Sequence, residues 1–233
     1  MTIAWFLTFN GPEEQRPGIT NWFCENGLEA LTIQPGVLSI DLFTAEKAHD
    51  PFNDDGNGPL LMVQVDFNGV DGLESLLASP AIQDSFLYHG EQLPAGCELV
   101  QGAYEVIEQA VGDNSEAQPR TAAFTYAVRY YRPAEDEKAF TDFYLSHHPQ
   151  IEADFPNIRN AICYMPVTWN NPVPVPVEDI MIGNEVVFDS LADFNAAMKS
   201  DVRIRMRDDF ANFPKFTGPS THFPLSRQRV HEA

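Results

Sequence analysis

A repeat at one fixed offset constrains the fold of this chain more than any other feature of its sequence. Identical residues recur 121 positions apart without a gap, as the differences 133 − 12 and 200 − 79 show. The aligned pairs include Pro12 and Pro133, Glu14 and Glu135, Thr20 and Thr141, Pro35 and Pro156, Pro51 and Pro172, and Ser79 and Ser200. Apolar character recurs at the same offset, for example at Trp5 and Tyr126. Self-similarity at a constant spacing indicates an internal duplication.

Each copy contains the same predicted order of elements. An apolar or alternating run opens it, and a helical segment, two strands, a second helical region and a last strand follow. The helical segments are expected at about 16–33 and 70–88 in the first copy, and at about 134–153 and 190–213 in the second. This strand–helix–strand–strand–helix–strand order is that of the ferredoxin-like fold.

The predicted fold is therefore α+β, with two ferredoxin-like repeats at residues 1–110 and 119–233. The polar segment 111–118 lacks periodicity and is predicted to be a linker. Each repeat would leave one face of its antiparallel sheet bare. Two such sheets in one chain are expected to pack face to face around a shared cavity.

The charge balance limits the classes of partner. The 233 residues contain 34 acidic and 14 basic side chains, for a net charge of −20. Such a field repels phosphate backbones and anionic membranes, so we expect no nucleic acid or membrane partner. The N-terminal residues show neither a signal peptide nor a long apolar run. Three widely spaced cysteines, Cys24, Cys97 and Cys163, fit a reducing cytoplasm.

Two adjacent histidines, in the segment FYLSHHPQIEADFP, are the first candidates for chemistry. Phe140, Tyr144, His147 and Ile151 follow the spacing of one buried helical stripe, which places His148 at its boundary. A histidine at such a boundary can meet a substrate and act as a general base near neutral pH. The alternative is an ordinary core or surface histidine.

The repeat supplies a second observation on the same pair. At the offset of 121, His148 aligns with Gly27 and His147 with Asn26, so the first copy has no imidazole there. One copy therefore keeps the candidate chemistry and the other is predicted to be a scaffold. Pro149 lacks a backbone donor, and we expect it to fix where the helix turns away.

Arg129 is the candidate for binding a substrate carboxylate. In the strand around it, Tyr126, Val128 and Tyr130 share one face, and Arg129 and Tyr131 share the other. If the more apolar face packs on helices, Arg129 and Tyr131 point into the cavity between the sheets, where a guanidinium can hold a carboxylate. A structural salt bridge is the alternative.

Other charged and proline-rich segments are predicted to be structural or peripheral. The segment DVRIRMRDD carries arginines at 203, 205 and 207, which we expect to pair with the aspartates at 201, 208 and 209. His148 and Glu152 have i, i+4 spacing, but Pro149 intervenes and no third ligand is evident, so no metal site is predicted. In the proline-rich segment 166–178, Trp169 is either a lid residue or part of a rigid connector.

No cofactor motif is present. The sequence lacks a glycine-rich phosphate loop, a G-x-S-x-G elbow and a Cys-x-x-Cys pair. We therefore expect no metal and no organic cofactor. The predicted catalytic residues are His148 and Tyr144. The predicted substrate-binding residues are Arg129, Tyr131, His147, Trp169 and His222.

The segment RPAEDEKAFTDFYLSHHPQIEADFPNIRN resembles the EthD-like group of the dimeric α+β barrel superfamily. The matching positions are Arg132, Pro133, Phe140, Tyr144, His148, Pro149, Ile151 and Pro156. His148 precedes Pro156 by eight residues (156 − 148), which is the group's spacing for its active-site histidine. The chain departs from the pattern at Pro149, which follows the histidine directly, and at Asn157, which replaces a glycine. The resemblance implies an intrachain version of the dimeric barrel.

The same resemblance implies a class of reaction. The group includes methylmuconolactone methylisomerases, which work without a cofactor. We expect an isomerase in which His148 moves a proton on a small carboxylated lactone or unsaturated acid of aromatic catabolism, with Tyr131 or Tyr144 polarising an oxygen. Ester hydrolysis, decarboxylation, cyclisation and a non-catalytic binding role remain alternatives. If the protein is an enzyme, we expect a pocket at His148. If it is a non-catalytic binding protein, we expect a filled interior in which His148 is paired to a carboxylate.

Overall fold

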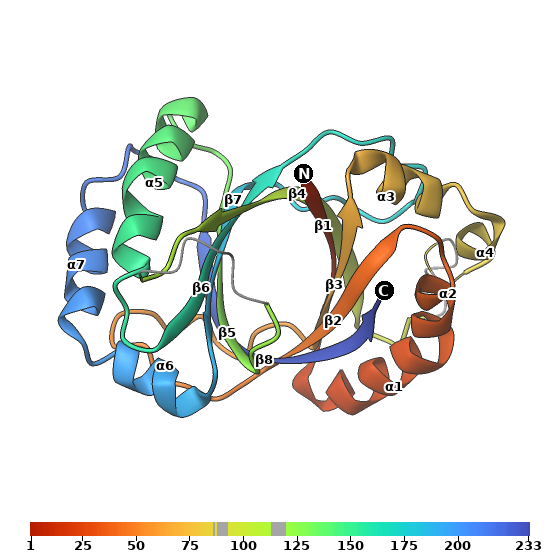
Figure 1. Cartoon of the computed structure of the whole chain (residues 1–233). Coiled ribbons are helices and arrows are strands. Elements are labelled where there is room, and N and C mark those ends of the chain that lie inside the picture. Colours follow the sequence, from red (N-terminus) through yellow and green to blue (C-terminus); the bar gives the residue numbers. More distant parts are fainter. Residues whose placement is uncertain (86, 88–92, 113–119) are drawn as a thin grey trace.

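The chain forms a closed barrel of eight antiparallel strands with helices on two opposite sides (Figure 1). The structure is a computed structural model that describes residues 1–85, 87, 93–112 and 120–233. Of the predicted linker at 111–118, only residues 111 and 112 lie within this described part. The predicted α+β class and antiparallel pairing are confirmed.

The strands of the two sheets that we expected to pack face to face are hydrogen-bonded into one closed barrel. The strands are β1 (Thr2–Asn10), β2 (Val37–Ala45), β3 (Leu61–Asn68), β4 (Glu98–Gln109), β5 (Phe124–Tyr131), β6 (Ile158–Pro166), β7 (Ile180–Phe188) and β8 (Ser220–Glu232). Their order around the barrel is β1-β3-β2-β8-β5-β7-β6-β4. Pairing of β2 with β8 and of β4 with β6 joins the two halves. Closure leaves no free sheet edge among these strands.

The helices divide into two groups according to sequence. The first group is α1 (Arg16–Asn26), α2 (Leu28–Thr32), α3 (Val70–Leu77) and α4 (Pro80–Gln83), preceded by a short 3₁₀ turn at Glu13–Gln15. The second group is α5 (Glu137–Glu152), α6 (Leu191–Ala197) and α7 (Asp201–Phe210). The two groups flank opposite sides of the barrel (Figure 1). None of the helices in the described residues is both long and apolar enough to cross a membrane.

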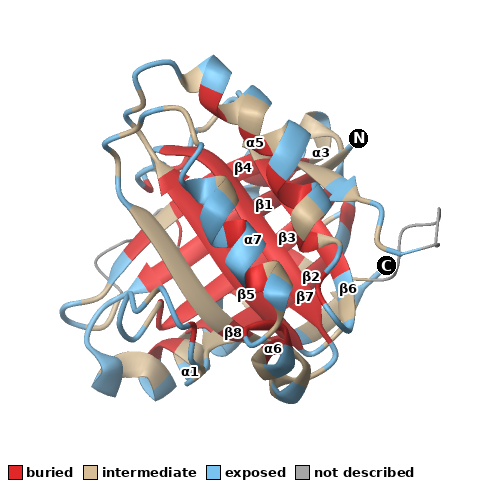
Figure 2. Ribbon diagram, turned by 90° about the vertical axis from the view of Figure 1, so that its left-hand side faces the viewer, coloured by how far each residue is buried: buried red, intermediate tan, exposed pale blue. Residues whose placement is uncertain are grey.

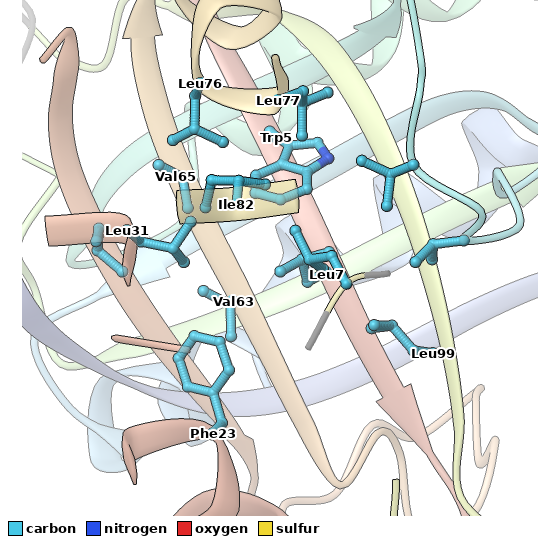
Figure 3. Close-up of a cluster of buried hydrophobic side chains, with 14 of the residues drawn as sticks. Trp5, Leu7, Phe23, Leu31, Val63, Val65, Leu76, Leu77, Ile82 and Leu99 are labelled. Atoms are coloured by element: carbon cyan, nitrogen blue, oxygen red, sulfur yellow. The ribbon is translucent and has the colours of Figure 1, made fainter. Parts of the chain in front are cut away.

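The strands are buried on both faces because one face lines the barrel and the other supports a helical layer. In β1, every residue from Ile3 to Phe9 is buried. The barrel interior is packed with aromatic side chains, and Phe6, Tyr104 and Tyr164 meet edge to face. The outer face of the first half carries an apolar cluster around Trp5 (Figure 3). Aromatic side chains therefore occupy space in which we expected a shared cavity.

The elements recur at the offset that the sequence shows. Strand β2 runs from Val37 to Ala45 and β6 from Ile158 to Pro166, and both ends differ by 121 (158 − 37 and 166 − 45). The residues just before these strands, at positions 36 and 157, both have positive φ values, 90° for the glycine and 61° for the asparagine. Asparagine tolerates this left-handed conformation better than most residues. Asn157 therefore substitutes for the expected glycine.

Each half sends one loop across the helical layer of the other half. The loop between β6 and β7 brings Val173 and Val175 into the apolar cluster of the first half. There, Gln101 Nε2 donates to the Val175 carbonyl at 2.9 Å and to Asn171 Oδ1 at 3.2 Å. The corresponding loop between β2 and β3, at residues 46–60, lies against the helical layer of the second half. Each layer is therefore completed by the opposite half.

Candidate functional site

The second half contains a cavity of about 110 Å³ between the outer face of the barrel and the covering helices. Figure 2 shows α5 and α7 lying over buried strands on this side of the molecule. Tyr126, Val128 and Tyr130 of β5 form the floor. The loop 46–60 contributes Phe52 and Asn53 at the entrance. The cavity is thus a pocket between helices and sheet, outside the barrel interior.

His148 faces this cavity from α5. The helix begins after Asp136, whose side chain accepts a hydrogen bond from the Ala139 backbone N–H, and it continues through Pro149 to Glu152. Pro149 has no backbone N–H to donate to the carbonyl of Leu145, four residues earlier. That carbonyl instead accepts a hydrogen bond from Gln150 Nε2 at 3.1 Å. Our expectation that Pro149 marks where the helix turns away is therefore wrong.

The buried stripe of α5 differs from the predicted one by one position. The buried residues are Phe140, Tyr144, His148, Pro149 and Glu152, so the stripe follows the i, i+4, i+8 row. His147 is exposed and stacks on Phe143, with ring centroids 4.3 Å apart. Packing of α5 against α7 covers the side from which His148 projects. The structure therefore places His148 at the cavity and His147 at the surface.

Asp209 of α7 orients the His148 ring. Its Oδ2 atom lies 2.7 Å from His148 Nδ1, and the imidazole packs against the rings of Tyr144 and Phe213 at 4.8 and 5.0 Å. An ionised carboxylate only accepts, so Nδ1 carries the hydrogen and Nε2 of a neutral ring is free to take a proton. Burial lowers the pKa of His148, and Asp209 opposes that shift only in part.

Glu152 is the second titratable group at the cavity. Its Oε1 atom lies 4.0 Å from His148 Nε2, and its Oε2 atom accepts a hydrogen bond from Asn184 Nδ2 at 2.7 Å. Burial raises the pKa of Glu152 to about 8, although the bond from Asn184 acts in the opposite direction. Near neutral pH, a neutral imidazole therefore stands beside a neutral carboxylic acid.

The floor of the cavity continues from β5 onto the two neighbouring strands. Asn184 of β7 and His222 of β8 both pair with Val128 of β5, so the three positions are adjacent across the sheet. His222 Nδ1 lies 2.9 Å from Asp55 Oδ2, on the loop from the first half. Burial lowers the pKa of His222. His222, predicted to bind substrate, does line the same cavity as His148.

The loop 46–60 is fastened over the cavity by Asp50. Arg203 Nη2 donates to both oxygens of Asp50 at 2.8 Å, and the Tyr126 hydroxyl donates to it at 2.6 Å. Burial alone would raise the pKa of Asp50, but the hydrogen bonds from Arg203 and Tyr126 outweigh it and hold that pKa below its usual range. Phe52 lies against the guanidinium groups of Arg203 and Arg207. The entrance is therefore built from both halves.

The arginines of α7 do not pair as predicted. Arg203 binds Asp50, and Arg205 binds Asp154 at 2.8 Å, whereas we expected partners on α7 itself. Asp209 points to His148 instead. The cause is geometric, because the long-range partners lie on the loop and on α5's C-terminal turn, where a sequence pattern cannot place them.

Arg129 and Tyr131 lie on the opposite face of the sheet from His148. Arg129 Nη1 donates to the carbonyls of Val128 and Asn184, and its guanidinium lies 5.0 Å from the Phe6 ring inside the barrel. Tyr131 donates to Glu178 at 3.3 Å. The strand alternation was interpreted correctly, but the cavity lies on the helix side. The structure does not bring this pair to His148.

Of the two remaining predicted residues, Tyr144 lies at His148 and Trp169 does not. Tyr144 contacts the His148 ring, and its buried hydroxyl has no hydrogen bond within the described residues. Trp169 packs against the apolar cluster of the first half and does not line the cavity that contains His148. Within the described part of the chain, no three His, Cys, Asp or Glu side chains gather as metal ligands.

Sequence reasoning missed Asp209, Asn184 and Asp50, and it weighed Glu152 only as a metal ligand. Asn184 had a usable signal, because it is an amide within the otherwise apolar run IMIGNEVVF. A buried amide in a strand needs a polar partner, and here that partner is Glu152. Asp209 and Asp50 had no such signal, since their partners are 61 and 153 residues away.

The comparisons with known proteins agree with this architecture. No protein-family model matches the sequence, and no curated protein matches it either. A solved anthrone oxidase-like protein is similar over 99% of this chain and 94% of its own, with 11% identity and a TM-score of 0.63. A provisionally assigned monooxygenase of Lactobacillus acidophilus NCFM is similar over 98% and 95%, with 12% identity and a TM-score of 0.55.

A shorter EthD-family protein of Bacillus halodurans C-125 aligns with 42% of this chain and 96% of its own, with 20% identity and a TM-score of 0.34. The two full-length likenesses show the fold. The chain shares with these two proteins an α+β fold, which closes here into one eight-stranded barrel within a single polypeptide.

Proposed function

We propose that this chain is an isomerase that moves a proton within a small carboxylated lactone or unsaturated acid, of the kind formed in aromatic catabolism. The proposal assigns the reaction to His148 and Glu152, with no metal or organic cofactor as reactant. It includes two ferredoxin-like repeats, at 1–110 and 119–233, of which the second carries the site and the first supports it. The EthD-like resemblance around His148 supports the same assignment.

One observation carries the proposal. A neutral base and a neutral acid face one cavity, with His148 Nε2 4.0 Å from Glu152 Oε1. An isomerisation of this type needs a base to remove a proton from one carbon and an acid to return a proton to another atom. Here His148 accepts the first proton, and its imidazolium is stabilised by Asp209. Glu152 supplies the second proton, and transfer from His148 to Glu152 then restores both groups.

The lining of the cavity also fits the polarity of such a substrate. Its wall combines the rings of Tyr126, Tyr130 and Phe155 with the polar groups of His148 and Asn184. An apolar wall with a few converging polar groups is the usual composition of a small-molecule site. The pairing of His148 with a carboxylate was expected of a binding protein, but the presence of the cavity beside it favours the enzyme.

A second candidate is a cofactor-independent oxygenase. Two full-length structural neighbours have names that refer to oxidation or oxygenation. The same proton removal by His148 would prepare an electron-rich carbon of an aromatic substrate for attack on O₂. The two candidates differ in a measurable way, because only the second consumes oxygen.

The test is proton exchange on a panel of muconolactones and related ring-cleavage acids in D₂O. We expect the wild-type chain to introduce deuterium into one of them and to form its isomer, observed by NMR. His148→Ala should lower the rate by about 10²-fold or more, because removal of a general base costs that much. His147→Asn, on the same helix but at the surface, is the matched control and should retain the wild-type rate.

Two results would contradict the proposal. If His148→Ala keeps full activity while His147→Asn abolishes it, the base is assigned to the wrong histidine. If turnover consumes one O₂ per substrate in an oxygen electrode, the chain is an oxygenase and the isomerase is excluded.

A further inference from the structure

We propose that Arg207 binds the carboxylate of the substrate at the mouth of the cavity. This inference rests on the proposed function, since it identifies the group that recognises the small acid. It replaces Arg129, which lies inside the barrel and cannot reach the site from there.

Arg207 stands apart from the other arginines in its charge pairing. The sequence contains ten arginines, and eight of them form ion pairs with carboxylates in the structure. The two exceptions within the described residues are Arg129 and Arg207. Arg129 is buried among the aromatic rings of the barrel interior. Arg207 is exposed and lines the cavity that contains His148.

The contact that Arg207 does make leaves its hydrogen-bonding edge free. Its guanidinium carbon lies 4.5 Å from the centroid of the Phe52 ring. Stacking on an aromatic face occupies the flat side of the guanidinium, whereas its N–H groups point outward in the plane. Those N–H groups can then hold a carboxylate through two parallel hydrogen bonds.

Arg203, the other cation of the cavity, is already occupied. It lies one helical turn before Arg207 and also contacts Phe52, at 4.8 Å. Both oxygens of Asp50 accept from its Nη2 atom at 2.8 Å, so its charge is neutralised within the protein. To bind Arg203, a carboxylate on the substrate would have to displace Asp50 from both of these hydrogen bonds. Arg207 requires no such displacement.

The overall charge makes such a local cation necessary. With a net charge of −20, the protein repels small anions from most of its surface. The loop at the entrance adds Asp54 and Asp55 to that field. An unpaired arginine at the mouth gives an anion one favourable contact, and the rings of Tyr126, Phe155 and Phe210 accommodate an apolar, planar body. The predicted ligand is therefore an aromatic or conjugated carboxylate.

The experiment compares benzoate with benzamide, which has nearly the same shape but no charge. Binding is measured by NMR titration or calorimetry at low salt, on the wild type and on Arg207→Gln, Arg207→Lys and Arg205→Gln. We expect the wild type to bind benzoate about tenfold more tightly than benzamide. Arg207→Gln should abolish that preference, whereas Arg207→Lys, which keeps the charge but not the planar fork, should retain part of it.

Arg205→Gln is the matched control, because Arg205 lies on the same helix, is exposed and pairs with Asp154 away from the cavity. It should leave the preference unchanged. Equal binding of benzoate and benzamide by the wild type, no effect of Arg207→Gln, or an equal effect of Arg205→Gln would each overturn the assignment. The same titration on His148→Ala separates the two proposals, because loss of the base should leave benzoate binding intact.

Discussion

The two helical layers of this barrel differ in what they bury: one covers an apolar core, and the other covers a cavity lined by polar side chains. At the offset of 121, the polar residues of the cavity align with residues that are apolar or uncharged in the first half. The aligned pairs are Gly27 with His148, Leu31 with Glu152, Val63 with Asn184, Ile82 with Arg203, and Gln101 with His222. Leu31, Val63 and Ile82 pack in the cluster of Figure 3. A few side chains therefore decide whether a layer is a core or a site.

The comparison also shows how buried polar groups lower the stability of the second half. Leu31 needs only apolar contacts, whereas Glu152 at the equivalent position needs Asn184 and still keeps its proton near neutral pH. Burying polar groups lowers stability unless every hydrogen bond is made. The first half gains stability from apolar contacts that the second half lacks around its cavity.

The two loops that cross to the opposite half, one between β2 and β3 and one between β6 and β7, also differ in whether charged or neutral groups hold them. In the first half, the neutral Gln101 holds the loop through Asn171 and Val175, and it also accepts a bond from Trp5 Nε1 at 3.0 Å. In the second half, the charged pair of Asp50 and Arg203 holds the loop. One loop seals a core, and the other forms the entrance of a cavity.

Asp50→Ala gives the largest expected effect on this difference. It leaves Arg203 buried without its carboxylate, and we expect a loss of about 3 kcal/mol in the free energy of unfolding, because removing one partner of a buried pair is strongly destabilising. The equivalent change in the other loop, Asn171→Ala, removes one neutral acceptor and should cost about 1 kcal/mol. Urea denaturation of both variants measures the contrast. Equal losses would show that the two loops are held equally well.

Converting the site into a core should have a smaller effect of opposite sign. Glu152→Leu combined with Asn184→Val copies the pair at positions 31 and 63 and should raise the unfolding free energy by about 2 kcal/mol at pH 8, while abolishing turnover. The pKa of Glu152 is raised on folding to about 8, so the wild type is stabilised by this proton at low pH and loses that stability as pH rises through 8.

The pH dependence of this double variant provides its control. The pKa of Glu178 is also raised by burial and acts in the same direction, so the difference between wild type and variant isolates Glu152. Thermal unfolding between pH 6.5 and 8.5 should show a weaker decline for the variant. Identical declines would mean that Glu152 is already ionised in the folded protein.

The smallest expected effects concern positions 36 and 157, where the two halves use a glycine and an asparagine at positive φ. Asn157→Gly should change stability by only a few tenths of a kcal/mol, as it loses a surface bond from Asn157 Nδ2 to Asp193 but keeps the conformation. Asn157→Ala and Gly36→Ala should each cost about 1 kcal/mol. If alanine is tolerated at either position, the left-handed conformation is not required there.

Much of the fold follows from the sequence because it depends on local periodicity. The repeat places β2 and β6 at matching positions, and strand alternation orients Arg129 toward the barrel interior as observed. Alternation cannot show which side of the sheet contains a cavity, and for that reason Arg129 was assigned to the site. Helical periodicity likewise cannot decide whether His147 or His148 is the buried histidine, because the answer depends on where α7 packs.

The parts of the site that could not be predicted depend on distant contacts. His148 was predicted because its own segment carries the signal. Asp209 and Asp50 meet their partners only when α7 and the loop 46–60 reach the same cavity. A sequence shows near neighbours such as Asp208 beside Arg207. It does not show that Asp50 will meet Arg203 across 153 positions.

The seam between β2 and β8 has a consequence for how the barrel is made. Thr44 and Ser226, whose hydroxyl oxygens lie 2.7 Å apart in this seam, are separated by 182 residues. Joining segments so distant in sequence incurs a large loop-closure entropy before any contact rewards it, and such topologies fold slowly. During synthesis, β2 must wait with one edge unpaired until β8 has left the ribosome. Between the synthesis of β2 and that of β8, the unpaired edge of β2 in the nascent chain is most exposed to pairing with a strand of another chain.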